Sequence, residues 1–219
     1  MNTYIKRVFI FFSILILSQG LRSQTLSPPI PVEIFLGHQS IYSQTVIKKR
    51  LKQGSKLSFF GLATFTADYN TETIENNSLT IINQLSYQFG KGFGVMIGTD
   101  INSNAGFSPI IGPQYNYSSS EFLAVTVLSI FLNSDIDVRI LGLYEYKPKI
   151  TDVLTLYTRL QFLYNQNSVQ GTHNRSYLYL RAGIKKNSLI IGLAANLDQR
   201  GPNNIFQDNY GVFVRYELR

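Results

Sequence analysis

Apolar and polar side chains alternate at every second position along much of this chain, and this alternation restricts the folds that it can form. In TLYTRLQFLY, residues 155–164, Leu160 and Phe162 fall on one face of an extended chain while Arg159 and Gln161 fall on the other. A period of two is typical of a β-strand with one apolar face, whereas a helix repeats every 3.6 residues. Beyond residue 32 no helical periodicity lasts more than two turns. The sequence therefore predicts an all-β fold.

The alternating runs are separated by breaks rich in Gly, Asn, Ser and Lys, and each run is read as one strand. Short breaks such as GKG (90–92) take turns with longer ones such as QNSVQGTHN (166–174) and QRGPNNIFQDN (199–209). This arrangement is typical of an antiparallel up-and-down barrel with turns at one end and loops at the other. Twelve strands are expected, or ten because the first run is short, at Val32–Gly37, Ile41–Leu51, Leu57–Tyr69, Leu79–Phe89, Phe93–Asn102, Ser108–Tyr117, Phe122–Leu132, Asp135–Lys147, Val153–Tyr164, Arg175–Lys185, Leu189–Asp198 and Tyr210–Leu218.

The N-terminus has the composition of a secretory signal peptide. Lys6 and Arg7 precede an apolar run at 8–17, and small or polar residues follow it. Cleavage after Ser23 is preferred over cleavage after Gly20, and a retained N-terminal anchor is the alternative. We therefore expect a Sec-type signal peptide at 1–23, an extended lead-in at 24–31 that contains LSPPIP, and a single barrel domain at 32–219.

Charge and cysteine content exclude several classes of protein. Without Lys6, Arg7 and Arg22, the 20 basic residues fall to 17 against 13 acidic ones, a net charge of +4 that is too small to indicate nucleic-acid binding. The chain has no cysteine. A disulfide framework, a cysteine-ligated metal and a lipid-modified N-terminal cysteine are therefore excluded, and no cofactor is expected.

The position of the charges favours a membrane barrel over a soluble sandwich. No run after the signal peptide is long enough for a spanning helix, so a membrane-embedded chain would cross as strands. In such a barrel the apolar face contacts lipid and the interior can be polar. Tyrosines such as Tyr69, Tyr117 and Tyr146 gather near strand ends, where a membrane interface would suit them. We expect an outer-membrane barrel in contact with lipid. The alternative is a soluble sandwich with its arginines on the solvent side.

Charged residues on the polar faces of the late strands, together with Glu33 on the first strand, are the candidate functional residues. Charges in a confined interior are costly unless they are paired. They therefore predict either an ion-pair network that fills a structural barrel or a narrow charge-lined pore whose field selects solutes. Tyrosines on the same face, such as Tyr157, Tyr177 and Tyr179, favour a plugged or very narrow interior. The charge network is expected to comprise Glu33, Asp137, Arg139, Glu145, Arg159, Arg181, Arg215 and Glu217.

The exported part of the chain resembles the small outer-membrane β-barrel proteins of Bacteroidota, most of which have no assigned activity. The segments VEIFLGH, YEYKPK, RSYLYLRAGI and the terminal NYGVFVRYELR carry the resemblance. The last of these is similar to the C-terminal strand signal that the barrel-assembly machinery reads. A final Phe or Trp is usual there, so with Arg219 at the end Leu218 would serve as the terminal apolar residue. The resemblance implies that this machinery is a partner during insertion.

A hydrolase is the alternative function, and it rests on one histidine. His38 and His173 are the only histidines, both in expected connections, and neither has a second ligand at metal spacing. A lipid hydrolase would need a serine beside its histidine, and His173 with Ser176 is the only candidate pair. A rim protease would combine His173 with Asp135 and Asp137. Neither spacing is a recognised motif, so the sequence favours a protein that is not an enzyme.

Overall fold

The computed structural model of the chain is a closed antiparallel barrel of twelve strands. It describes residues 29–52, 54–69, 77–134 and 136–218, so the predicted signal peptide and most of the lead-in lie outside the described residues. No helix in these ranges is long and apolar enough to cross a membrane. The strands are β1 (Ile30–Gly37), β2 (Ser40–Arg50), β3 (Leu57–Asp68), β4 (Ser78–Gly90), β5 (Phe93–Asn102), β6 (Gly106–Ser118), β7 (Phe122–Phe131), β8 (Asp137–Tyr146), β9 (Leu154–Asn167), β10 (His173–Lys186), β11 (Leu189–Arg200) and β12 (Ile205–Leu218).

Each strand pairs with its neighbours in sequence, and β1 pairs with β12 to close the barrel. The closing register runs from Ile30 opposite Leu218 to Gly37 opposite Gly211. The short first run is therefore a full member of the wall, paired on both sides, and the prediction of twelve strands is confirmed over ten. We call the end of the barrel where β1 begins and β12 finishes the termini end, and the opposite end, which carries the turns 38–39, 103–105, 168–172 and 201–204, the far end.

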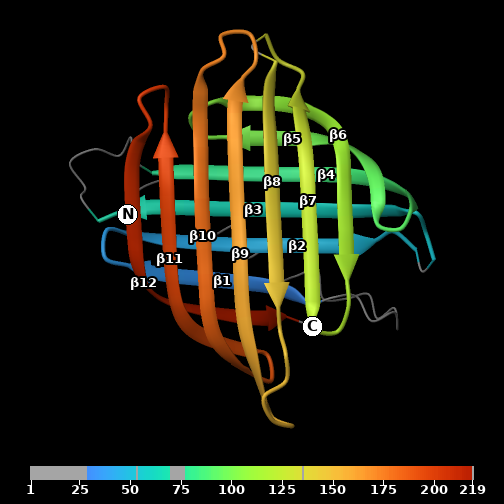
Figure 1. The fold of residues 1–219 in the computed structure, drawn as a ribbon, viewed down its shortest axis with the longest axis vertical. Helices are drawn as coiled ribbons and strands as arrows, with labels where there is room; N and C mark the ends of the chain where they lie inside the picture. Colours follow the sequence, from blue (N-terminus) through green and yellow to red (C-terminus); the bar gives the residue numbers. More distant parts are fainter. Residues whose placement is uncertain (1–28, 53, 70–76, 135, 219) are drawn as a thin grey trace, which may run out of the picture.

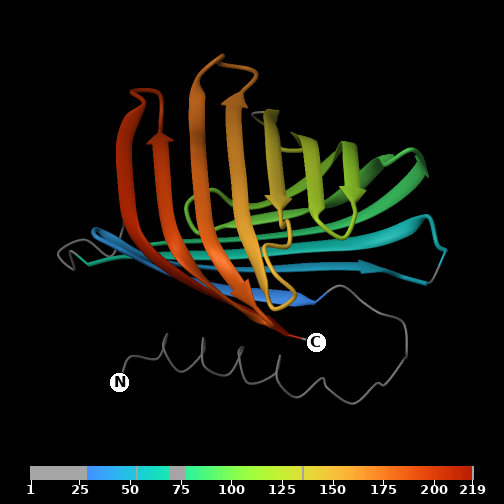
Figure 2. The same ribbon diagram turned by 60° about the horizontal axis from the view of Figure 1, so that its bottom comes forward.

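The barrel is flattened, so its two walls lie close together. Figure 1 shows β7 to β12 running along one direction in front and β1 to β5 running across them behind. Figure 2 shows that β9 to β12 bend along their length toward β1. Side chains from opposite walls therefore meet in the interior, as the contact between Glu33 on β1 and Arg159 on β9 demonstrates.

The predicted inside and outside faces of the late strands are confirmed. On β9, Leu160 is 40% exposed while the neighbouring Arg159 is 3% exposed. On β12, Val212 and Val214 are exposed, and Phe213 between them is completely buried. The outer surface is thus largely apolar and the charged side chains are enclosed, which is the reverse of a soluble protein with its charges in water.

Two clusters of apolar side chains fill much of the interior. The larger one comes mainly from β3 to β8, and it includes Leu62, Ile82, Met96, Val127 and Leu141. The smaller one is mostly aromatic and comprises Phe35, Tyr42, Tyr157, Tyr179, Ile190, Ala194 and Phe213. The wet interior expected from the late strands therefore occupies only one side of the barrel.

Several connections are shorter than the sequence predicts, and the expected long loops near the C-terminus are wrong. β10 begins at His173 and β12 at Ile205, so the turns between β9 and β10 and between β11 and β12 shrink to residues 168–172 and 201–204. The residues that suggested loops are polar because they lie on the inner face at the far end, as with buried Asn167 and Asn209. β1 also begins earlier than expected, at Ile30 inside the predicted lead-in.

Candidate functional site

Eight charged side chains on the polar side of the interior form a set of ion pairs that we call the polar column. Strand pairing brings them to neighbouring positions, because Glu33 lies opposite Arg215 and Arg159 lies opposite Arg181. All eight point to the inner face because each has the inward parity of its strand. The column consists of Glu33, Glu145, Lys147, Arg159, Arg181, Lys185, Arg215 and Glu217.

Glu33 holds together the centre of the polar column. Its Oε1 atom accepts a hydrogen bond from Arg159 Nη2 at 2.7 Å and another from Arg181 Nε at 2.8 Å. Two arginines on directly opposite positions of adjacent strands repel each other, and the shared carboxylate offsets this repulsion. Arg181 also donates to Asn196 Oδ1 at 2.8 Å and lies over the ring of Phe35.

Glu145 is the second centre of the column, nearer the termini end. Its carboxylate accepts from Arg215 Nη1 at 2.7 Å, from the Tyr157 hydroxyl at 2.9 Å and from Lys147 Nζ at 3.1 Å. Closer still to the termini end, Lys185 Nζ donates to Glu217 Oε2 at 2.5 Å. The ion pairs therefore continue from the middle of the barrel to this end.

Amide and tyrosine side chains continue the polar path toward the far end. Tyr42 donates to Gln44 at 2.6 Å, Gln44 donates to Gln161 at 3.2 Å, and Gln161 donates to Tyr177 at 2.9 Å. Gln44 lies opposite Glu33. Gln161 lies on the same face of β9 as Arg159, two residues away. The path is thus continuous with the polar column.

A cavity of about 400 Å³ lies inside the far end, and we call it the vestibule. Tyr42 and Tyr177 line it together with many Asn, Ser and Thr side chains. Ion pairs hold three of its charged residues, since Arg139 donates to Asp100 and Arg175 donates twice to Asp198 at 2.8 and 2.9 Å. A polar side thus extends from the termini end to the vestibule, beside the apolar cluster.

The polar column carries more positive than negative charge. Its five bases face three acids, a net charge of +2. Within the described part of the chain, Glu33 Oε2, Arg159 Nε, Arg181 Nη2 and Arg215 Nε have no hydrogen-bond partner. Buried guanidinium groups with unmet donors and a positive surplus make this region attractive to anions.

The structure places six of the eight predicted site residues in the polar column: Glu33, Glu145, Arg159, Arg181, Arg215 and, at its termini end, Glu217. The other two lie elsewhere along the inner face. Arg139 pairs with Asp100 in the vestibule, and Asp137 accepts a hydrogen bond from Asn174 at the far end.

Five residues in these ion pairs are not among the predicted site residues: Asp100, Lys147, Arg175, Lys185 and Asp198. Their inward parity is the signal that identifies them. Asp100 lies on an early strand and the other four lie near strand ends.

The two histidines lie at the far end. His38 is in the turn between β1 and β2, as expected, while His173 is the first residue of β10. His173 contacts Ser176, its predicted partner, at 3.1 Å. Asp137 faces the interior, opposite buried Asn167, whereas His173 is paired with outward-facing Gln166, so these two do not meet. The described residues contain no group of three or more potential metal ligands.

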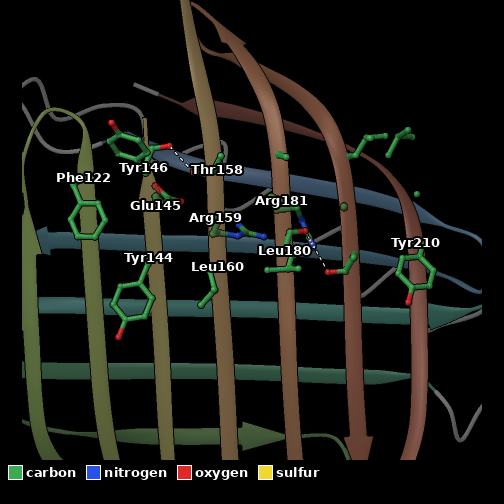
Figure 3. Close-up of a pocket in the computed structure, with 16 residues that line it drawn as sticks. Phe122, Tyr144, Glu145, Tyr146, Thr158, Arg159, Leu160, Leu180, Arg181 and Tyr210 are labelled. Carbon is green, nitrogen blue, oxygen red and sulfur yellow. Dashed lines mark hydrogen bonds between the residues drawn. The ribbon is translucent and has the colours of Figure 1, made fainter. Parts of the chain in front are cut away.

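The outer surface of β7 to β12 carries a shallow apolar groove. One row of paired residues crosses it, from Tyr144 through Leu160, Leu180 and Ala195 to Tyr210. Figure 3 labels Tyr144, Leu160, Leu180 and Tyr210 of this row, together with Arg159 and Arg181, which follow or precede a member of the row by one residue. A one-residue step in a strand moves a side chain to the other face, so outward-facing and interior residues are neighbours in sequence.

The comparisons with known proteins bear on the fold. No family model matches the chain, and no curated protein matches it. Among solved structures, the chain is similar to the NanC porin, with a TM-score of 0.50 and 11% identity over 87% of this chain and 100% of that one. It also matches the KdgM porin, with a TM-score of 0.49, 10% identity and coverage of 87% and 99%. At this identity the likeness shows a shared barrel fold alone.

Proposed function

We propose that this protein is an outer-membrane β-barrel whose polar column is a narrow, charge-lined passage closed by its own ion pairs. The observation that carries the proposal is the continuity of the polar side. It extends from the Lys185–Glu217 pair through Glu145 and Glu33 to the vestibule. The apolar outer surface supports the membrane location, because such a surface is stable against lipid and not against water.

The alternative is an interior whose charged residues only stabilise the barrel. The difference in composition between the apolar side and the polar side of the interior favours a passage instead. The cluster on β3 to β8 fills its side with apolar residues. Well-packed apolar residues stabilise an interior at least as well as buried ion pairs do. Stability alone therefore does not account for eight charged residues on the other side. Twelve strands also lie between the roughly eight that side chains can fill and the roughly sixteen that leave an open channel.

The ion pairs support a closed resting passage and a preference for anions. Glu33 and Glu145 each bridge basic residues from different strands, so their side chains occupy the middle of the polar side. A solute would have to displace at least one of these pairs. The surplus of positive charge in the column favours small anions over cations.

The sequence supports further proposals about the export and membrane insertion of the protein. We infer export by a Sec-type signal peptide at 1–23, contact with outer-membrane lipid, and insertion by the barrel-assembly machinery through the C-terminal strand. Four short motifs also favour the Bacteroidota type of small barrel.

Recordings from purified protein in planar lipid bilayers test the passage. We expect the wild-type protein to conduct little. The triple variant Glu33→Ala, Arg159→Ala, Arg181→Ala, which removes the central ion pairs, should open a conducting path on the polar side.

The matched control removes three side chains from the apolar side, in Leu62→Ala, Ile82→Ala, Leu141→Ala. It should stay closed, because an apolar gap does not admit hydrated ions. Heat-modifiable migration confirms that each variant is folded. Equal conductance of the two triple variants, or none in either, contradicts the passage and favours the structural alternative.

A further inference from the structure

A serine and a histidine on the outer surface are hydrogen-bonded in the arrangement of a nucleophile and its base. His173 Nε2 lies 3.1 Å from Ser176 Oγ, and His173 Nδ1 lies 2.9 Å from the carbonyl oxygen of Gly201. A carbonyl oxygen can only accept, so Nδ1 carries the proton and Nε2 is free to accept from the serine hydroxyl. This is the tautomer that a general base for serine needs.

A β-bulge creates this pair. His173 lies opposite Gln166 and Arg175 lies opposite Asn165, so Asn174 between them is the extra residue. Without the bulge His173 would share the inward parity of Arg175. The bulge instead turns His173 to the outer face, where it meets Ser176.

Hydrogen bonds fix both the side chain and the backbone carbonyl of Asn174, the bulge residue. The Asn174 side chain donates to Asp137 Oδ1 at 2.9 Å, and its carbonyl oxygen accepts from the backbone N–H of Gly201 at 2.8 Å. The same turn that holds Asn174 therefore also presents the Gly201 carbonyl to His173. Backbone groups of Asn174 and Gly201 therefore help to position His173 beside Ser176.

The pair lies in a row of outward-facing residues at the far end. Tyr164 and Gln199 are the two strand partners of Ser176, and Phe206 is the partner of Gln199. Tyr164 and Phe206 are exposed on either side of it. Exposed aromatic residues at the end of a membrane strand are typical of the lipid–water interface. Ester groups of membrane lipids occupy the same depth.

A side-chain amide lies beside the serine. Ser176 Oγ is 3.3 Å from Gln199 Oε1, an amide oxygen that accepts from the serine hydroxyl. The hydroxyl proton therefore has two acceptors within reach, Gln199 Oε1 and His173 Nε2.

We propose that Ser176 and His173 form a serine-esterase site for the acyl esters of membrane lipids. Ser176 Oγ attacks the ester carbonyl carbon while its proton moves to His173 Nε2. The ester C–O bond then breaks, and His173 returns this proton to the departing alcohol. Water, deprotonated by His173, attacks the acyl-serine, releases the fatty acid and restores Ser176.

The site is separate from the polar column, which lies on the other face of the wall. The esterase proposal therefore does not depend on whether the interior conducts.

Labelling of the refolded protein with a fluorophosphonate tests the nucleophile. We expect a single adduct, located on Ser176 by peptide mass spectrometry, and none in Ser176→Ala. His173→Ala should slow labelling by about 10²–10⁴-fold, because the base is lost. The matched control is Ser168→Ala, which removes an exposed serine of the adjacent turn and should label normally. No adduct on folded wild-type protein, or equal labelling in His173→Ala, overturns the proposal.

Release of fatty acid from phosphatidylglycerol vesicles tests the substrate class. Wild-type protein should release fatty acid and Ser176→Ala should not. Heat-modifiable migration again shows that each variant is folded. Hydrolysis of a short water-soluble ester with none from vesicles would overturn the assignment to membrane lipids.

Discussion

The carboxylate of Glu33 and the guanidinium of Arg159 meet at 2.7 Å although the two residues are 126 positions apart in sequence. β12, β11 and β10 lie between their strands around the wall. The contact therefore crosses the interior and does not follow the sheet. Both side chains are about 1% exposed, so the pair is isolated from water. This one contact joins the two walls of the barrel at the centre of the polar column.

Removing Glu33 should destabilise the barrel strongly. Glu33→Ala leaves Arg159 and Arg181 buried, adjacent and unpaired, and should lower the free energy of unfolding by about 3–5 kcal/mol. Denaturant titration of the protein in lipid vesicles measures this loss. Glu217→Ala is the control, and its loss should be smaller because its partner Lys185 is 23% exposed and can reach water. Equal losses in the two variants would show that the central pair has no special role.

A charge on the outer face should be costly only at mid-membrane depth. Leu160→Arg, in the middle of β9, should lower stability by about 2–4 kcal/mol, whereas Tyr164→Arg, near the far end of the same strand, should lower it by about 0–1 kcal/mol. Vesicle-based unfolding of the two variants gives the comparison. A silent Leu160→Arg would contradict the assignment of this face to lipid.

Any current through the barrel should be carried mainly by anions. The column has five bases and three acids, so its field attracts negative ions. Reversal potentials in a salt gradient measure this preference in the opened triple variant, whose remaining column charges are Glu145, Lys147, Lys185, Arg215 and Glu217. Adding Lys147→Glu and Lys185→Glu should reverse its sign, because acids then outnumber bases. Cation selectivity before these additions would contradict the charge argument.

The protein should fractionate with outer membranes. Its exposed apolar surface requires lipid, and a closed barrel should migrate faster in detergent electrophoresis before boiling than after it. Membrane fractionation and unboiled gels provide the measurements. Recovery as a soluble monomer in the periplasm would contradict the membrane location.

The sequence by itself determined the properties that depend on local geometry. Side chains in a strand alternate between faces whatever the strand pairs with. The outward position of Leu160 and the inward position of Arg159 could therefore be predicted from TLYTRLQFLY alone. The preferred number of twelve strands followed in the same way, because each break in the alternation marks a turn, whereas the alternative of ten was excluded only by the pairing of β1 on both sides.

Only the tertiary structure decided which inward residues meet. Glu33 contacts Arg159 because the closed barrel is flattened, and flattening depends on the registers of all twelve strands together. Asp100 reaches Arg139 for the same reason. The bulge at Asn174, which turns His173 outward to Ser176, breaks the period of two, so no argument from alternation could find it. The face on which a side chain lies depends on its own strand, whereas a contact across the interior depends on how all the strands of the barrel pair.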